Sequence, residues 1–344
     1  MAMPDVTVRG AGVFGLATAW ALLKRGLCVQ VIDPNGVASG ASGGIVGALA
    51  PHVPEQWNPK KAFQLESLLM ADDWWADVAA CGGCDPGYAR TGRVQPLAEA
   101  GVALAKDRAK GADTLWQGRA RWQVTDQPGD FAPPSASGLW VHDTLSARIH
   151  PRQACDALAA AVCAKGGEIS TGDIRHGGPT VWATGHEGLA DLTARHTRLV
   201  GAGIKGQAVL LAHDARDAPQ VFIDGLHIIP HGDGTTAIGS TTERDFDDGT
   251  ATDTQCDALL DKARALMPVL RDAPELIRWA GVRPRARTRA PMLGRHPFRQ
   301  GDFIANGGFK IGFGMAPLAA EQLAHLITTG ENLIPEDFAP DRSL

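Results

Sequence analysis

Residues 6–33 contain the feature that most constrains what this chain can fold into. An apolar strand, Val6-Thr7-Val8, leads into Gly10-Ala11-Gly12-Val13-Phe14-Gly15, and an apolar helical stretch then leads to a second strand that ends at Asp33. In this spacing the first glycine permits a tight turn, the second lets a pyrophosphate approach the backbone, and the third lets the helix pack on the strand. Free N–H groups at the helix N-terminus favour phosphate binding, and Asp33 is placed to accept hydrogen bonds from ribose hydroxyls. The pattern predicts a dinucleotide-binding α/β unit rather than a glycine-rich turn that binds nothing.

A polar, glycine-rich loop follows the second strand. It reads Ser39-Gly40-Ala41-Ser42-Gly43-Gly44 and continues through Gly47-Ala48 to Pro51. A domain that binds NAD usually continues directly into further βαβ units, whereas a loop of this kind can lie along an extended cofactor and donate hydrogen bonds to it. We therefore expect FAD rather than NAD, and the alternative is a flexible surface loop.

Four segments resemble the D-amino-acid oxidase family of FAD enzymes, which includes glycine oxidase, sarcosine oxidase and D-amino-acid dehydrogenases. The first is Val31-Ile32-Asp33-Pro34 together with residues 38–51. Residues 279–284 are similar to the strand that carries the family's substrate-carboxylate arginine, and residues 291–297 to the segment after it. Residues 307–317 are similar to the loop and helix start under the flavin ring. The resemblance spans both ends of the chain and indicates the family without indicating the member.

The resemblance implies an α/β (α+β) fold in which a Rossmann-like FAD-binding lobe is interleaved with an antiparallel-sheet substrate lobe. Residues 1–52, 145–204 and 281–344 are expected in the FAD-binding lobe, and residues 53–144 and 205–280 in the substrate lobe. The residue pattern predicts helices over 60–80, 101–110, 151–165, 253–267 and 317–327, and short strands over 207–211, 220–223, 227–230 and 236–240. Nine residues separate Ser170 from Thr180, fewer than the family's usual β-hairpin at this point, so contacts near the adenine are expected to be reduced.

The same resemblance assigns a set of positions to the cofactor. These are Gly10, Gly12, Val13, Phe14, Gly15, Asp33, Pro34, Ser39, Ala41, Ser42, Gly47, Ala48, Ala183, Thr184, Gly185, Gly281, Arg283, Gly308, Phe309, Lys310, Ile311 and Gly312. Covalent members of the family attach the flavin to a cysteine in the loop before the last helix. Residues 307–317 contain no cysteine, so non-covalent FAD is expected.

Arg283 is expected to anchor the substrate carboxylate, because a planar guanidinium can bind a carboxylate through two parallel hydrogen bonds. Arginines stand at four alternate positions, Arg283, Arg285, Arg287 and Arg289, which would share one face of a strand. Burying four unpaired cations in a row would be very costly. A turn directly after Arg283 is therefore expected, with Arg285, Arg287 or Arg289 outside in a solvated basic stripe.

Two further side chains are candidates at the substrate site by resemblance. Lys310 stands where glycine-oxidase-like members carry an arginine, and it could supply charge near the flavin pyrimidine or reach the substrate. His227 stands where relatives often place a carboxylate-binding tyrosine, although a lone histidine on a strand can equally be structural; the chain has one tyrosine, Tyr88. Ala48 and Thr242 stand where relatives place larger residues, which implies a roomy pocket.

Composition narrows the class of protein. The chain has 344 residues, of which 44% are hydrophobic and 21% charged, as expected of a globular protein larger than one ordinary domain. The net charge of −5 gives no global attraction to nucleic acid, which leaves such binding to a local patch. No apolar run approaches the ~20 residues of a membrane-spanning helix. The N-terminus lacks a basic signal region, and six scattered cysteines fit mostly buried, reduced thiols of a cytoplasmic protein.

Metal binding is not expected. The chain has no HExxH motif, and Cys81-Gly82-Gly83-Cys84 lacks both a second cysteine pair and a nearby histidine. Whether Cys81 and Cys84 form a redox pair is left open.

These observations favour an FAD-dependent oxidoreductase that oxidises the C–N bond of a small amino acid or secondary amine by hydride transfer to flavin N5. One alternative is the oxidase module of an enzyme that modifies the wobble uridine of tRNA, in which the arginine-rich run, Arg295 and Arg299 would form a phosphate-facing patch. Another is a flavoprotein that binds or assembles without turnover. The substrate, its stereochemistry, the electron acceptor and the oligomeric state are left open.

Overall fold

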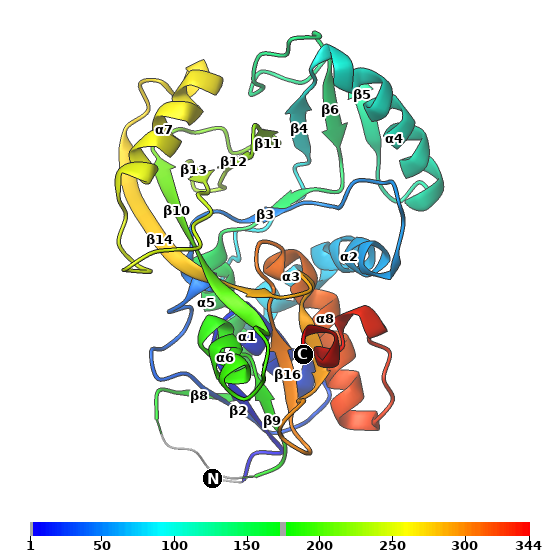
Figure 1. Cartoon of the computed structure of the whole chain (residues 1–344), viewed down its shortest axis with the longest axis vertical. Helices are drawn as coiled ribbons and strands as arrows, with labels where there is room; N and C mark the ends of the chain where they lie inside the picture. The colour runs from blue at the N-terminus through cyan, green and yellow to red at the C-terminus, as the bar shows by residue number, and fades with distance from the viewer. Residues whose placement is uncertain (1–2, 173–176) are drawn as a thin grey trace.

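The computed structural model describes residues 3–172 and 177–344 and contains two large β-sheets (Figure 1). A six-stranded sheet lies in the lower part of the view and an eight-stranded sheet in the upper part. Two long strands, β10 (Gly201–Leu211) and β14 (Glu275–Ala286), run from one part to the other. The predicted fold, a Rossmann-like sheet with a largely antiparallel second sheet, is confirmed.

The six-stranded sheet has the order β15-β16-β9-β1-β2-β8. Its strands are β1 (Val6–Arg9), β2 (Val29–Ile32), β8 (Glu168–Ser170), β9 (Thr180–Trp182), β15 (Met292–Arg295) and β16 (Phe303–Asn306). Neighbouring strands are parallel, except that β15 is antiparallel to β16. The helix α1 (Val13–Lys24) contacts β1, β2 and the helices α5 (Pro151–Ala164) and α8 (Gly312–Thr329). Because α1 is surrounded in this way, all but the last of its residues are buried.

The eight-stranded sheet has the order β14-β10-β13-β12-β11-β4-β6-β5. Its other strands are β4 (Arg93–Pro96), β5 (Trp122–Thr125), β6 (Trp140–Asp143), β11 (Gln220–Ile223), β12 (Leu226–Pro230) and β13 (Thr236–Gly239). Only β11 and β4 pair in parallel. The helix α7 (Thr254–Leu266) packs on β10 and β13 and closes a second apolar core, separate from the one around α1.

The remaining elements connect these layers. They are the helices α2 (Pro59–Leu69), α3 (Ala71–Gly82), α4 (Val102–Leu115) and α6 (Gly185–Ala194), the strand pair β3 (Ala48–Leu49) and β7 (Ala147–Arg148), and short 3-10 helices at Ala41–Gly43, Glu99–Gly101, Pro268–Leu270, Glu336–Phe338 and Pro340–Ser343. Among the described residues no helix is long and apolar enough to cross a membrane.

The single helix predicted over 60–80 is wrong, because α2 and α3 are separate helices that meet at Met70. The two helices have different main partners, since α2 packs mainly on α8 whereas α3 packs mainly on α5. The break at Met70 lets each apolar face turn toward its own main partner.

The predicted start of the last helix at Pro317 is also wrong. The helix α8 begins at Gly312 and keeps Pro317 inside it. Proline lacks the N–H that a helix interior requires, and the next N–H, that of Leu318, donates to the hydroxyl of Ser67 at 3.3 Å. A side chain of α2 therefore supports the helix where the proline interrupts it.

Three of the six cysteines, Cys28, Cys84 and Cys163, are exposed, so the expectation of mostly buried thiols is wrong. Cys28 lies just before β2, Cys84 lies just after the end of α3, and Cys163 lies in the last turn of α5. Cys81 and Cys84 are both free thiols.

Candidate functional site

The glycines after β1 form a close-packed turn. Gly10 has φ +105°, and a Cβ atom there would lie 2.3 Å from the carbonyl oxygen of Ala183. A Cβ at Gly15 would lie 1.9 Å from the carbonyl oxygen of Gly10. The ends of β1 and β9 therefore meet at this turn, which brings the predicted residues Ala183 and Thr184 next to Gly10.

Polar groups surround the N-terminus of α1. The carboxylate of Asp33 accepts a hydrogen bond from the N–H of Ala11 at 2.9 Å, and the hydroxyl of Ser42 accepts one from the N–H of Val13 at 3.0 Å. The first intrahelical bond runs from Leu16 to Gly12, so the N–H groups of Phe14 and Gly15 precede the helical ladder and point out of its N-terminus. This end of the helix suits an anion.

The loop after Asp33 continues from this turn toward β14. A Cβ at Gly47 would lie 1.9 Å from the carbonyl oxygen of Ile149, and a Cβ at Gly44 would lie 3.2 Å from the Trp279 ring. The loop is thus pressed between the α5 side of the molecule and the strand that carries Arg283. Two predicted cofactor residues in this region, Pro34 and Ser39, are exposed.

Residues 307–312 form the other wall of the candidate site. The N–H of Phe309 donates to the carbonyl of Pro284 on β14 at 2.9 Å, and Phe309 has φ +45°. A Cβ at Gly308 would lie 3.0 Å from the Phe14 ring, so this loop also touches the first turn of α1. The Phe309 ring centroid lies 5.6 Å from the Arg283 guanidinium, 5.8 Å from that of Arg285 and 5.8 Å from Lys310 Nζ.

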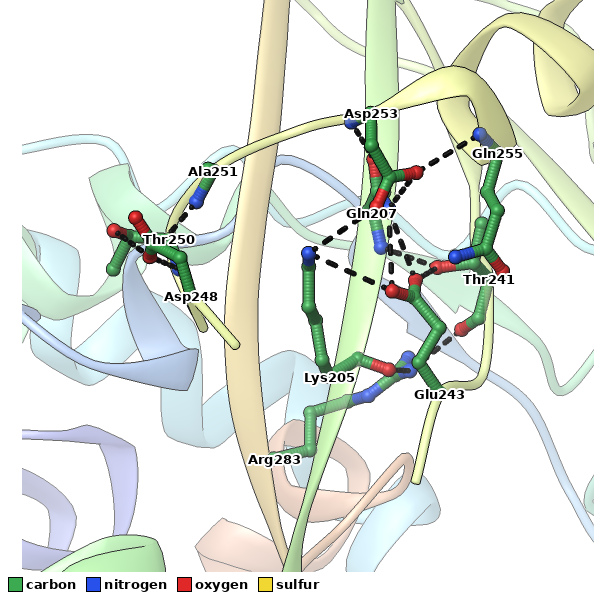
Figure 2. A network of polar contacts seen from close by, with 10 residues as sticks. All are labelled: Lys205, Gln207, Thr241, Glu243, Asp248, Thr250, Ala251, Asp253, Gln255 and Arg283. Atoms are coloured by element: carbon green, nitrogen blue, oxygen red, sulfur yellow. Dashed lines mark hydrogen bonds and ion pairs between the residues drawn. The ribbon is translucent and has the colours of Figure 1, made fainter. Parts of the chain in front are cut away.

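Arg283 is held by one hydroxyl and two carbonyl groups, and Figure 2 shows the carbonyl contacts to Lys205 and Thr241. Its Nη1 donates to Ser240 Oγ at 2.6 Å, and its Nη2 donates to the carbonyls of Thr241 at 2.7 Å and Lys205 at 3.1 Å. Its Nε is buried and has no acceptor among the described residues. Burial lowers the pKa of Arg283 to about 10, opposed by the charge of Glu243, so the side chain stays cationic at neutral pH.

The turn expected directly after Arg283 is wrong. The strand β14 continues to Ala286, because its pairing with β10 extends to Gly201 opposite Ala286. Arg285 is accommodated half-buried beside Phe309, and Arg287 and Arg289 are exposed beyond the strand.

Lys310 lies beside Arg283 at the candidate site. Its Nζ donates to the hydroxyl of Thr242 at 3.0 Å. Burial, and then the charge of Arg283, lower the pKa of Lys310. Neither cation hydrogen-bonds a carboxylate among the described residues.

His227, on β12, lies within reach of the charges of Lys310 and Arg93. Burial first, and then the charges of Arg93 and Lys310, lower the pKa of His227 to about 3, so the imidazole is neutral at pH 7. The ring lies 4.8 Å from that of Phe222, and Nδ1 is buried without a partner among the described residues. A neutral imidazole can offer one acceptor nitrogen.

Comparison with known proteins identifies the family. The model described as FAD dependent oxidoreductase (DAO) matches residues 5–326. This chain belongs to the DAO family of FAD-dependent oxidoreductases. Glycine oxidase from Pseudomonas aeruginosa is 28% identical to it over 97% of this chain and 98% of the relative. The crystal structure of glycine oxidase from Geobacillus kaustophilus shares the fold, with a TM-score of 0.84, 23% identity and 98% of both chains covered.

A longer relative also matches this DAO-family chain. The tRNA 5-methylaminomethyl-2-thiouridine biosynthesis bifunctional protein from Chromohalobacter salexigens is 27% identical over 80% of this chain. The match spans 41% of that protein.

The residues of this DAO-family chain fit FAD at the N-terminus of α1. Side chains at Gly10 and Gly15 would collide with backbone atoms, and a Cβ at Gly12 would lie 3.1 Å from Ser42 Oγ. The Asp33 carboxylate accepts hydrogen bonds from two backbone N–H groups, those of Ala11 and Asn35. It has further lone pairs that could accept hydrogen bonds from ribose hydroxyls. Asp33, Ser42 and the first turn of α1 are thus the groups that would hold the adenosine and pyrophosphate part.

Sequence reasoning missed several residues that complete the candidate site of this oxidoreductase. Ser240 and Thr241 hold Arg283, and Arg93 faces His227 while forming a buried ion pair with Asp143 at 3.0 Å. The run of hydroxyl residues that follows β13 is a signal that could have indicated the first two. Arg93 gave no such signal, because its partner lies fifty residues away.

Proposed function

We propose that this FAD-dependent oxidoreductase oxidises the C–N bond of a small, carboxylate-bearing amino acid or secondary amine, as a glycine-oxidase-type enzyme. The observation that carries the proposal is the pair of cations, Arg283 and Lys310, beside one aromatic ring. Within the described part of the chain no carboxylate is hydrogen-bonded to either cation. Arg283 is half-buried and Lys310 is exposed, and two cations held this close together repel each other until an anion joins them. A substrate carboxylate would supply the missing negative charge.

In this proposal Arg283 binds the carboxylate, because charge-assisted hydrogen bonds from a guanidinium are strong and directional. Lys310 adds positive potential at the same place. Two cations near the substrate nitrogen also favour the neutral amine over the ammonium form, and only the neutral amine has a lone pair to form the C=N bond. His227, itself neutral, can accept a hydrogen bond from that amine without adding a third charge.

FAD, held by the first turn of α1, Asp33 and Ser42, would supply the hydride acceptor for the substrate α-carbon. The protein residues orient the substrate for this transfer and provide the electrostatic field. The N-terminus of α8 at Gly312, beside the Lys310 loop, adds a partial positive charge at the flavin end of the site. We propose that FAD is held without a covalent bond, because residues 307–317 contain no cysteine.

A panel of amines tests the proposal. The purified FAD-loaded protein is incubated with glycine, sarcosine, proline and D-amino acids and an artificial electron acceptor, and the 2-oxo acid or aldehyde product is measured. We expect product from at least one carboxylate-bearing amine and none from the matching amine without a carboxylate. Equal turnover of both members of each pair would contradict the role of the cations.

The tRNA alternative receives less support from the arginine positions. Arg287 donates to the carbonyl of Ser343 at 3.1 Å, and Arg299 stacks on Trp182 at 4.0 Å. Arg285 faces Phe309, so these side chains do not form one free phosphate-facing row. Binding of bulk tRNA whose log K falls with log[salt], with a slope of roughly −0.7 to −0.9 per phosphate contact, and which is lost on replacing Arg285, Arg287, Arg289 and Arg299 by alanine, would reverse this preference.

A further inference from the structure

A buried polar cluster lies behind Arg283, on the other face of the β10–β14 ribbon (Figure 2). Arg283 pairs with Ile204, and Val282 pairs with Lys205. Because consecutive side chains on a strand point to opposite faces, Lys205 and Gln207 lie on the face away from the Arg283 side chain. The cluster is therefore not part of the proposed carboxylate site.

Glu243 is the centre of this cluster. Lys205 Nζ lies 3.6 Å from Glu243 Oε2 and 3.6 Å from Asp253 Oδ2. The Gln207 amide donates to Glu243 at 3.1 Å and to Asp253 at 2.8 Å, and its oxygen accepts from the N–H of Asp253 at 2.9 Å. Lys205 and Glu243 are both buried.

Thr241 connects this cluster to Arg283. Its hydroxyl donates to Glu243 Oε1 and accepts from the N–H of Gln207 at 2.8 Å. Its carbonyl accepts from Arg283 Nη2 at 2.7 Å. The neighbouring Ser240 accepts from Nη1 of the same guanidinium, and the next residue, Thr242, accepts from Lys310. One short segment thus contacts both cations of the proposed site on one side and Glu243 on the other.

A buried ion pair is a poor source of stability, because the cost of desolvating both charges often exceeds their attraction. Apolar side chains would stabilise the same place at least as well. A connected polar network does fix geometry, however, since each member restricts the orientation of the next. The cluster is suited to hold the Thr241 carbonyl in one place.

We propose that Glu243 is a positioning residue for Arg283, acting through the hydroxyl of Thr241. The proposal rests on the proposed role of Arg283 as the carboxylate anchor. Glu243 and Lys205 fix the position of Thr241. The Thr241 carbonyl in turn fixes the plane of the Arg283 guanidinium. The remaining N–H groups of Arg283 then point in one direction. Catalysis depends steeply on such alignment, and small displacements of a binding group are costly.

The test uses the FAD-loaded full-length protein and glycolate, which keeps the carboxylate of glycine and replaces the amine by a hydroxyl group. Glycolate affinity is measured by the change in flavin absorbance, together with the melting temperature and FAD affinity. Glu243→Gln and Thr241→Val should each raise the glycolate Kd about tenfold while FAD affinity is unchanged. Glu243→Gln removes the charge that faces Lys205, and Thr241→Val removes the hydroxyl that links Glu243 to the Thr241 carbonyl. Because both changes act on one chain of contacts, the double variant should bind glycolate no more weakly than the weaker-binding single variant.

Matched controls separate positioning from stability. Asp248 lies in the same segment, is exposed and, among the described residues, is hydrogen-bonded by Thr250 and Ala251. It meets the cluster only through the charge of Lys205, so Asp248→Asn should leave the glycolate Kd unchanged. Thr241→Ser keeps the hydroxyl and should restore most of the affinity lost in Thr241→Val. A purely structural cluster would instead lower the melting temperature of both Glu243→Gln and Thr241→Val with no change in glycolate Kd, and that result overturns the proposal.

Arg283→Ala distinguishes the proposed role of Arg283 as carboxylate anchor from the proposed role of Glu243 in positioning it. If Arg283→Ala weakens glycolate binding but Glu243→Gln and Thr241→Val do not, the carboxylate anchor stands and the positioning role is wrong. If Arg283→Ala leaves the glycolate Kd unchanged, the anchor itself is wrong and the role of Glu243 falls with it. Additive losses in the Glu243→Gln/Thr241→Val double variant would show that Glu243 does not act through Thr241.

Discussion

Arg283 is bonded on one side by Ser240, Thr241 and Lys205, so few of its donors remain for a ligand. This makes the shape of the side chain as important as its charge. Arginine presents its donors in a rigid planar fork, whereas lysine is a point charge on a flexible stem. A lysine at this position has three donors on one nitrogen, so it could not reproduce the fixed directions in which Arg283 serves both the segment 240–241 and a carboxylate.

Arg283→Lys should therefore weaken substrate use much more than FAD binding. We expect a loss of about 2 to 3 kcal/mol in kcat/KM for a carboxylate-bearing amine, measured with the best substrate of the panel. Arg289→Lys, at an exposed position beyond the strand, is the matched control and should be neutral. An unchanged kcat/KM in Arg283→Lys and Arg283→Ala would show that the anchor is misassigned.

A substitution at Gly12 tests where the FAD pyrophosphate binds. A valine there would contact Ser42 and place methyl groups beside the free N–H groups of Phe14 and Gly15, where the pyrophosphate is proposed to lie. Gly12→Val should release FAD during gel filtration. Gly101→Val, at a glycine with one distant neighbour, should keep it. FAD retained by Gly12→Val would place the pyrophosphate elsewhere.

At the scale of elements, β12 holds His227 in a place where it cannot easily become charged. The pKa of about 3 in the folded protein lies below the ordinary value of about 6.5. The unfolded chain therefore takes up a proton as the pH falls below 6.5 while the folded chain does not. The contribution of the neutral His227 to stability is complete above pH 6.5 and is lost progressively toward pH 3.

Replacing His227 with glutamine should make the protein less sensitive to acid. Between pH 7 and pH 5 the wild-type protein should lose about 2 kcal/mol more unfolding free energy than His227→Gln. Urea unfolding at the two pH values measures this difference. Equal losses in both proteins would show that His227 titrates normally.

The composition of the loop 307–311 predicts that FAD is bound without a covalent bond. It contacts both β14 and the first turn of α1, and it contains no cysteine that could bond the flavin. Acid precipitation should leave the flavin in the supernatant. A yellow pellet that resists washing would contradict non-covalent binding.

The elements also show which features the sequence could predict. The glycine turn, α1 and the strands around it follow local rules of spacing, so they were predicted closely. The break at Met70 and the helix start at Gly312 depend on which helices lie alongside, and such tertiary contacts override local propensity. For the same reason the hydroxyl support of Arg283 was missed, because Ser240 and Thr241 meet it only after β13 and β14 are placed around β10.

At the scale of the whole molecule, the proposed site lies on the β10–β14 ribbon, the part of the eight-stranded sheet that extends toward the six-stranded sheet (Figure 1). We propose that residues 1–52, 145–204 and 281–344 form the FAD-binding lobe and residues 53–144 and 205–280 the substrate lobe. The ribbon crosses both boundaries, and Arg283 stands on it opposite Ile204. Such an arrangement lets one lobe hold FAD while the other covers the substrate.

The most direct test of this account is an anaerobic titration of the FAD-loaded protein with glycine, sarcosine, proline and D-amino acids, followed by flavin absorbance near its visible maximum. The account predicts that at least one carboxylate-bearing amine bleaches the flavin at high salt, and that Arg283→Ala requires far more of that amine. Dithionite serves as the control that the flavin can be reduced. If dithionite bleaches the flavin and none of these amines does at any concentration, the proposed amine oxidation is contradicted.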